Sequence, residues 1–239
     1  MAPEPERSQE WMLTGTKIFE SAMDAATDPL LLGPSRLPGW TGRHVVAHVA
    51  ANADALRNLA WWAATGVQTP MYASTRQRND DIEVGAQRPV EHLRRWCTGS
   101  ADALAADLDA LTTQQWQREV RTAQGRSVPA TEIRWLRARE VMVHAVDLGS
   151  GTTFGDLPSG FLEDLLDDIT VKRSATAGHP GVTLQDAATG RRWLVASPQP
   201  QDPVLSGPLP DLAAYLAGRD DGAGLHADQA ITASLPAWL

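Results

Sequence analysis

The chain divides into two parts with different residue patterns, and this division limits the folds open to it. Residues 8 to about 175 form long segments with apolar residues at helical spacing, separated by short turns. After residue 176, glycine, proline and short β-branched runs dominate. The sequence therefore predicts an α+β protein, with an up-and-down four-helix bundle over residues 1–176 and a small α+β domain over 177–239.

Cap and turn residues set the expected boundaries of the elements. Thr41 is a good N-cap, and Gly66 and Gly149 are good helix ends. The expected helices run from near Ser8, from Thr41 to Gly66, from near Ser74, from Pro89 to about Leu111, from Thr131 to Leu148, from Pro158 to about Thr176, and from Leu209 to Gly218. We expect a loop over 28–40, a hairpin over 117–130 turning at Gly125, strands over 182–187, 192–197 and 203–207, and an extended end.

Composition and charge exclude several classes of protein. In 239 residues, 43% are hydrophobic, which is too much apolar surface for a disordered chain. The 21 basic and 29 acidic residues give a net charge of -8, which disfavours nucleic acid or an anionic membrane as partner. No apolar run reaches the roughly 20 residues of a membrane span, and the polar N-terminus does not resemble a secretory signal. We expect a cytoplasmic monomer that acts on small molecules.

Two pairs of metal-ligating residue types have i, i+4 spacing. His44 and His48 share one face of a predicted helix, and Glu140 and His144 share one face of another. Zinc favours histidine and carboxylate ligands, and a catalytic zinc site keeps three protein ligands and an open position. The ordinary alternative for such spacing is a hydrogen bond on an exposed helix face. Spacing alone does not decide which of His44 and His48 would bind.

The residues around these pairs favour buried positions. Glu140 and His144 sit among the apolar residues Val141, Met142, Val143, Ala145 and Val146, and His48 is enclosed by the apolar residues of 45–50. A buried glutamate and histidine need a partner or a cation, because burying a charge alone is costly. Asp147 lies three residues after His144, where it could be a fourth ligand, an acceptor that orients the imidazole, or a helix-end residue.

Five segments of the chain resemble the mycothiol-dependent maleylpyruvate isomerases, a family of DinB-like metalloenzymes. They are LPGWTGRHVVAHVAANADAL (37–56), TPMYASTRQRNDDIEVG (69–85), TAQGRSVPATEIRWLRAREVMVHAVDLGSGTTFGDLP (122–158), VLSGPLPDLAAYLAGRDDG (204–222) and AWL (237–239). Two motifs that contain histidine, GWTGRHVVAH (39–48) and REVMVHAVDL (139–148), are typical of the wider superfamily. The stretch QGRSVPA and the AGR of the tail narrow the resemblance to the isomerases. Together the segments cover more than half of the chain.

The resemblance implies a site and a reaction. It implies His48, Glu140 and His144 as ligands of a divalent metal, usually zinc, with His44 left as a helix-start residue. It also implies a catalytic arginine in the C-terminal domain, Arg219. The reaction would convert maleylpyruvate to fumarylpyruvate in the gentisate pathway of aromatic degradation. The thiol of mycothiol would add to the double bond, the bond would rotate, and the thiol would leave.

Other residues and functions stay open. Tyr72, Arg78 and Asn79 could contact mycothiol or the substrate, or belong to an ordinary solvated segment. Trp61 or Trp62 could form a platform for the sugars of mycothiol, and Cys97 is expected to be a packed thiol. One alternative function is a mycothiol S-transferase acting on another electrophile. A second is a non-catalytic module that binds a metal or a ligand.

Overall fold

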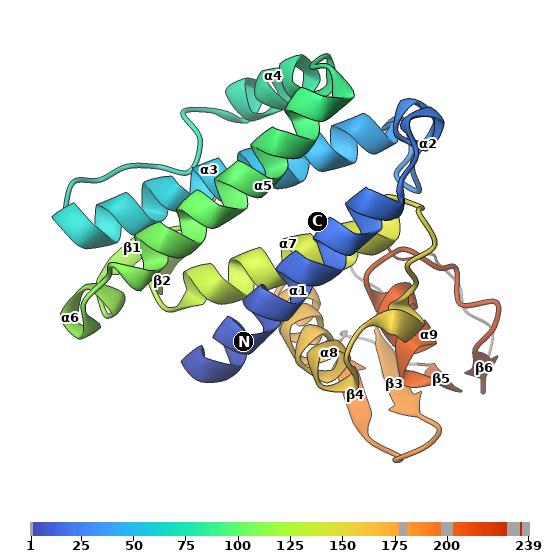
Figure 1. Ribbon diagram of the computed structural model, residues 1–239. Coiled ribbons are helices and arrows are strands. Elements are labelled where there is room, and N and C mark those ends of the chain that lie inside the picture. The colour runs from blue at the N-terminus through green and yellow to red at the C-terminus, as the bar shows by residue number, and fades with distance from the viewer. Residues whose placement is uncertain (1, 177–180, 197–202, 229–234, 236–239) are drawn as a thin grey trace. The chain divides into compact units, whose positions relative to one another are not determined.

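The structure, a computed structural model, describes residues 2–176, 181–196, 203–228 and 235 (Figure 1). It consists of two compact units. One is helical and covers Glu4–Thr152, and the other contains residues 153–239 with the first three residues of the chain. The predicted α+β fold class, with a helical bundle followed in the chain by a small α+β part, is confirmed.

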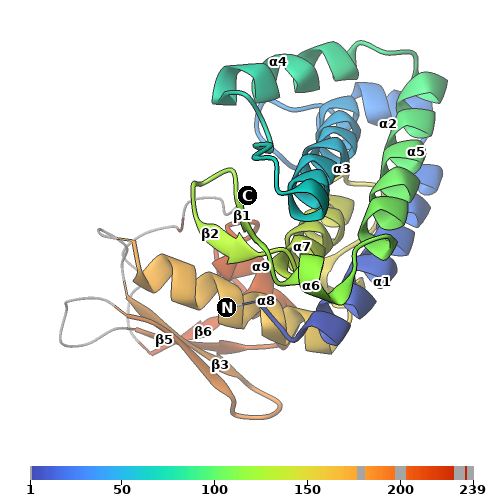
Figure 2. The ribbon, with the colours of Figure 1, turned by 90° about the vertical axis from the view of Figure 1, so that its left-hand side faces the viewer.

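Four long helices build the helical unit: α1 (Pro5–Ala25), α3 (Gly42–Thr65), α5 (Val90–Asp109) and α7 (Glu132–Asp147). Helix α7 packs against both α1 and α3, and α3 also packs against α5. Figure 2 shows α7 between α1 and α3. Helix α7 buries residues on nearly all of its faces, including Trp135, Met142 and Val146. This helix is therefore the centre of the unit, and polar groups on it have little access to water.

The ends of α3 and the start of α4 follow the predicted signals. Thr41 is the N-cap of α3, and Gly66, at φ 79°, ends it in the left-handed conformation that glycine adopts without strain. Helix α4 (Thr75–Ala86) begins after Ser74, whose Oγ accepts a hydrogen bond from the Gln77 backbone N–H at 3.0 Å. The hairpin is also confirmed, because β1 (Glu119–Arg121) pairs antiparallel with β2 (Ser127–Pro129) around Gly125.

Two short helices differ from the expectations. The predicted loop over 28–40 contains α2 (Asp28–Leu32), and α6 (Thr113–Trp116) precedes the hairpin. Pro29 lies in the first turn of α2, where its missing N–H costs no hydrogen bond, so the proline that suggests a loop is compatible with a helix start. Burial of Leu31, which is 0% exposed, holds this short helix against the bundle.

The second unit is a small sheet with two helices. After the 3-10 turn η1 (Phe154–Asp156) comes α8 (Ser159–Ser174), followed by β3 (Val182–Asp186), β4 (Arg192–Val195), β5 (Val204–Gly207), α9 (Leu209–Leu216) and β6 (His226–Ala227). The strand order is β4-β3-β5-β6, with β3 and β5 parallel and the other pairs antiparallel. The three predicted strands and the predicted helix lie where they were expected. The AWL segment at 237–239 lies outside the described residues.

The boundary between the units differs from the one that composition suggests. The units divide between Thr152 and Thr153, whereas the change in residue pattern falls near residue 176. Helix α8 explains the difference, because it packs against α9 and β4. An amphipathic pattern predicts that a helix buries one face, but it does not say against which surface.

Within the described parts of the chain, no helix is both long and apolar enough to cross a membrane.

Candidate metal centre

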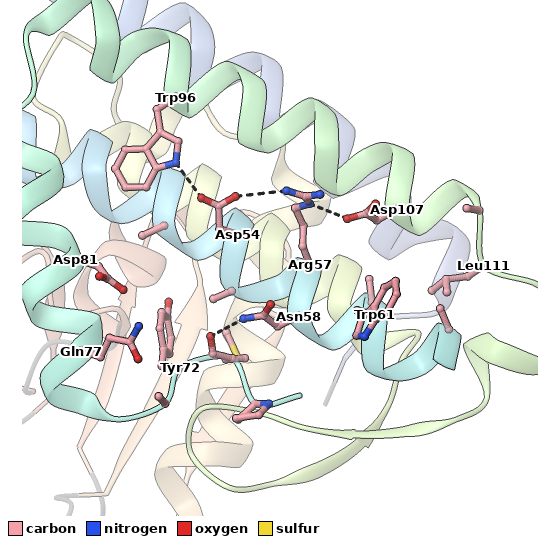
Figure 3. A pocket seen from close by; sticks show the side chains of 18 of the residues that line it. Asp54, Arg57, Asn58, Trp61, Tyr72, Gln77, Asp81, Trp96, Asp107 and Leu111 are labelled. Carbon is pink, nitrogen blue, oxygen red and sulfur yellow. Dashed lines mark hydrogen bonds and ion pairs between the residues drawn. The ribbon is translucent and has the colours of Figure 1, made fainter. Parts of the chain in front are cut away.

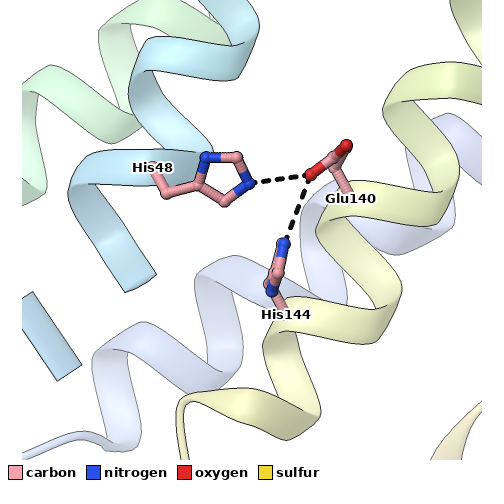
Figure 4. Close-up of side chains that lie close together, drawn as sticks. All are labelled: His48, Glu140 and His144. Atoms are coloured by element: carbon pink, nitrogen blue, oxygen red, sulfur yellow. Dashed lines mark hydrogen bonds and ion pairs between the residues drawn. The ribbon is translucent and has the colours of Figure 1, made fainter. Parts of the chain in front are cut away.

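Three side chains from two helices of the bundle converge on one point. His48 comes from α3, Glu140 and His144 come from α7, and one donor atom of each lies within 4.8 Å of the others (Figure 4). The Nε2 atom of His48 lies 3.0 Å from Glu140 Oε2, and Nε2 of His144 lies 3.3 Å from the same oxygen. The two histidines and the carboxylate thus point at a shared volume between α3 and α7.

The local sequence explains why these donors converge. Glu140 and His144 are separated by one turn of α7, so their side chains lie one above the other on the face toward α3. The side chain of His48 is 5% exposed and that of His144 is 2% exposed, so water does not solvate them freely. The ring of Trp40 meets the His48 imidazole edge-on, with 5.5 Å between centroids, and so covers the cluster near the start of α3.

The charges of the three groups are coupled. Burial by itself would raise the pKa of Glu140, but hydrogen bonds and charge from His144 and His48 hold it well below its ordinary value. Burial lowers the pKa of His48. For His144, burial acts in the same direction, but hydrogen bonds with Asp147 and Glu140 outweigh it and raise the pKa. The cluster therefore holds an ionised carboxylate beside one imidazole that burial keeps neutral.

The donor set fits a divalent cation such as zinc. Nε2 of His144 is buried, and its contact with Glu140 Oε2 at 3.3 Å is too poorly aligned to satisfy it fully, although a buried imidazole nitrogen normally requires a partner. Two imidazoles and one carboxylate, all from rigid helices, form a three-ligand set of the kind that a catalytic zinc uses. An ion between them would satisfy Nε2 of His144 and balance the charge of Glu140.

His44 lies one turn before His48 and does something different. Its Nδ1 accepts a hydrogen bond from the backbone N–H of Thr41 at 3.2 Å, which caps the first turn of α3. Because Nδ1 is an acceptor, the proton of the neutral ring is on Nε2, which faces Glu83 Oε2 at 3.3 Å. The structure therefore resolves the ambiguity of the sequence: His44 is a helix-start residue, and His48 faces Glu140.

Asp147 and Arg137 support the cluster from behind. Asp147 is fully buried, and its Oδ2 lies 2.8 Å from Nδ1 of His144, so it orients that ring rather than joining the three donors. Arg137, one turn before Glu140, is 2% exposed and donates to the Val49 carbonyl at 2.7 Å and to Asn52 Oδ1 at 3.1 Å. It thus fastens α7 to α3 beside His48.

Arg137 and Trp40 are the residues that the sequence analysis did not assign to the site. Arg134, Arg137 and Arg139 precede Glu140 on a helix expected to be largely buried. This is a signal that could have been noticed, because a buried guanidinium needs acceptors on a neighbouring element. Trp40 lies in the 37–56 segment, just before α3, but nothing in the spacing predicts that its ring reaches His48.

Of the three residues that could contact mycothiol or the substrate, two lie beside the cluster. Arg78, on α4, lies with Nη2 3.5 Å from Nδ1 of His48, and its guanidinium lies 6.0 Å from the centre of the Tyr72 ring. Burial, together with the charge of Glu140, raises the pKa of Tyr72 to about 12. Asn79 accepts a hydrogen bond from Arg78 at 3.2 Å on the exposed side of α4. Tyr72 and Arg78 therefore border the cluster, and Asn79 touches it only through Arg78.

Arg219 belongs to the second unit, and Cys97 belongs to the helical unit. Arg219 follows α9 in the second unit, and its Nη1 donates to the Ala217 carbonyl at 2.9 Å. Cys97 lies on α5 and is 2% exposed, and burial raises the pKa of its thiol to about 12. The expectation of a packed, unreactive cysteine agrees with this burial.

Comparison with known proteins places the chain in a family. The family described as "Mycothiol maleylpyruvate isomerase N-terminal domain" matches residues 13–149, which include all three donors. A crystal structure of the mycothiol-dependent maleylpyruvate isomerase matches with a TM-score of 0.93 and 36% sequence identity, over 99% of this chain and 98% of that chain. A histidine-to-alanine mutant of that enzyme matches at a TM-score of 0.92 with the same identity and coverage. No curated protein matches the chain. The chain therefore belongs to the mycothiol-dependent maleylpyruvate isomerase family.

Proposed function

We propose that this protein isomerises maleylpyruvate to fumarylpyruvate, with mycothiol as the thiol and with a divalent metal, zinc, at the cluster of His48, Glu140 and His144. One observation carries the proposal: a buried His–Glu–His cluster in a chain that is 36% identical, over 99% of its length, to the mycothiol-dependent maleylpyruvate isomerase. The gentisate pathway, a cytoplasmic location and a monomeric state remain predictions from the sequence.

The reaction needs a thiolate in a dry site. Zinc held by the three side chains would lower the pKa of a thiol at its open position and so supply a thiolate at neutral pH. The chain contributes the burial. With backbone and side chain counted together, His48 is 4% exposed and His144 is 1% exposed, so water competes little for the open position. Asp147 holds the His144 imidazole in the orientation that presents Nε2 to the ion.

The substrate provides the rest of the chemistry. The double bond of maleylpyruvate accepts the sulfur, its π electrons pass to the carbonyl oxygen as an enolate, and the remaining single bond rotates. The electrons then return, the carbon–sulfur bond breaks, and the thiol is recovered unchanged. Arg219 carries a rigid fork of N–H donors that suits a carboxylate or the developing enolate. We infer that Arg219 stabilises this charge.

The test is a spectroscopic assay of the zinc-loaded protein with maleylpyruvate, with and without mycothiol, combined with titration of free thiol. Fumarylpyruvate should form only when mycothiol is present, and the amount of thiol should not fall. Loss of thiol in step with product from another electrophile would instead identify an S-transferase. Absence of turnover with every thiol and electrophile would leave a binding module.

Replacing Arg219 by alanine tests its role. We expect the rate to fall about 100-fold, the effect of removing one donor from a developing oxyanion, while bound zinc is retained. The measurement is kcat together with the zinc content of the purified variant. An Arg219→Ala variant that is inactive because it has lost its zinc would contradict a role on the substrate.

A further inference from the structure

The helical unit contains a cavity that follows α3 from Ala51, one turn after His48, toward the C-terminal end of the helix. It has a volume of about 1030 Å³, and its walls come from α3, the segment before α4, α4 itself and the two ends of α5 (Figure 3). None of the three metal donors lines it. A cavity of this size is large enough for a ligand of two rings, and it is not explained by the metal cluster. We call it the α3–α5 cleft.

Tyr72 connects the cleft to the metal cluster. It is one of the lining residues of the cleft, and its ring faces Arg78, whose Nη2 lies 3.5 Å from His48 Nδ1. From Ala51, one turn after His48, the lining residues continue along α3 to Trp61. At 1.5 Å per residue these ten positions span about 15 Å. A molecule with one end at the metal could therefore place its other end in the cleft.

The charged groups of the cleft are already paired with one another. Arg57 donates to Asp107 at 2.6 Å and lies 3.7 Å from Asp54, and the indole N–H of Trp96 donates to Asp54 at 2.8 Å. Arg88 stacks on the Trp96 ring at 4.1 Å. With these arginines engaged by acidic or aromatic groups, the cleft offers little to a phosphate or carboxylate, which bare arginines would attract. The lining favours a ligand without strong charge.

The remaining lining groups suit a ligand that carries many hydroxyl groups. The Gln77 side chain offers a donor and an acceptor, and Asp81 offers acceptors. Asn58 uses one amide N–H on the Met71 carbonyl, which leaves its Oδ1 and a second N–H for a ligand. Gln115 accepts from Thr112 and donates to the Ala64 carbonyl, so it contributes only its second N–H. Trp61 lies at the far end, and it is 60% exposed, an unusual position for so large an apolar ring. The faces of sugar rings carry C–H groups that stack on aromatic rings, while their edges carry hydroxyls that pair with amides and carboxylates. An aromatic wall combined with amides is the chemistry of a saccharide site.

We propose that the α3–α5 cleft binds the glucosaminyl-inositol part of mycothiol, with Trp61 and Asp81 as its outer contacts. This inference rests on the proposed function, because it is the isomerase reaction that requires mycothiol. Mycothiol is N-acetylcysteine joined by an amide to this uncharged, hydroxyl-rich pair of rings. Binding the rings in the cleft leaves the cysteine end to pass Tyr72 toward His48.

The experiment measures ring binding separately from thiol chemistry. The probe is an N-acetylated glucosaminyl-inositol that lacks the cysteine, titrated calorimetrically into the full-length, zinc-loaded protein and its variants. Trp61→Ala and Asp81→Asn should each weaken the affinity for this probe about 10-fold and raise the KM for mycothiol by a similar factor. Their kcat at saturating mycothiol should change less than the KM does.

A matched control variant is available on the same helix. Asp80 neighbours Asp81 but does not line the cleft, and it makes an exposed ion pair with Arg76 at 3.6 Å. Asp80→Asn removes the same charge from α4, so it should leave both the probe affinity and the KM unchanged. If it acts as Asp81→Asn does, the effect is one of net charge, and the assignment of Asp81 is wrong.

A competition experiment tests whether the probe and mycothiol bind at the same site. The probe should inhibit turnover competitively against mycothiol, with an inhibition constant equal to its dissociation constant. A probe that binds but does not compete would show an independent sugar site and overturn the proposal. So would turnover with unchanged KM in Trp61→Ala and Asp81→Asn. If the protein binds the probe in the cleft but isomerises nothing, the cleft assignment stands and the proposed function fails.

Discussion

His44 and His48 lie on successive turns of α3, and each faces a glutamate of another helix, but the two pairs differ in burial. In the first turn, His44 lies 3.3 Å from Glu83, and these side chains are 15% and 63% exposed. In the second turn, His48 lies 3.0 Å from Glu140, and the corresponding values are 5% and 14%. Each is a histidine within hydrogen-bonding distance of a glutamate on another helix. Only the second pair has a further imidazole, that of His144, on the same carboxylate.

The comparison shows that burial and a third donor, rather than the spacing of the residues, distinguish a candidate ligand. An exposed His–Glu pair loses little when it is separated, because water replaces the partner. A buried pair has no such replacement, and its unmet hydrogen-bonding capacity can be satisfied by an ion.

The largest effect should come from removing a donor. His48→Ala should weaken zinc binding by more than about 100-fold, because groups that only support metal ligands already contribute 10–100-fold. His44→Ala, the matched variant one turn earlier, should bind zinc as the unmodified protein does. Zinc titration against a competing chelator measures both. Equal losses in the two variants would erase the distinction between the two turns.

Removing Arg137 should be the next largest change, this time in stability. Arg137→Met leaves the Val49 carbonyl and the Asn52 side chain without their donor inside the bundle, which should cost about 3 kcal/mol in the free energy of unfolding. Arg134→Met, one turn earlier on α7, removes only a guanidinium stacked on Trp116 and should cost less than about 1 kcal/mol. Chemical denaturation of the two variants gives the comparison. Similar losses would mean that Arg137 does not fasten α3 to α7.

Asp147→Asn should weaken zinc binding by about 10–100-fold without unfolding the protein. The amide still reaches Nδ1 of His144, but it carries no charge and so makes the ring a poorer donor to the ion. Zinc competition and thermal denaturation of the same samples separate the effect on affinity from the effect on stability. Unchanged affinity would reduce Asp147 to a helix-end residue, one of the alternatives that the sequence leaves open.

The smallest effect should come from the first turn of α3. His44→Ala removes the acceptor for the Thr41 N–H and should lower the free energy of unfolding by about 1 kcal/mol, the usual contribution of a helix cap. Glu83→Gln keeps the cap and should change the free energy of unfolding by less than about 0.5 kcal/mol, because the His44–Glu83 pair is exposed. Denaturant titration can resolve the two. A larger loss in Glu83→Gln would show that the ion pair, not the cap, stabilises this turn.

The sequence predicts where helices begin and end better than it predicts which segments pack against them. The cap at Thr41, the glycine ends at Gly66 and Gly149, and the i, i+4 pair of Glu140 and His144 all follow from local rules, and the structure contains each of them. The choice of His48 over His44 required the family resemblance, because both lie on one face of one helix. Helix α8 and Arg137 show the limit: which surface a helix packs on, and which carbonyl a buried arginine reaches, depend on contacts between segments far apart in the sequence.

The burial of Cys97 has a consequence for the lifetime of such an enzyme. A protein that works with a small thiol meets that thiol's oxidised forms too, and an accessible thiolate would exchange with them to give a mixed disulfide. The only cysteine of this chain is enclosed in α5, and its pKa of about 12 keeps it protonated. The folded protein therefore keeps a single covalent form while the redox state of the surrounding thiol pool changes.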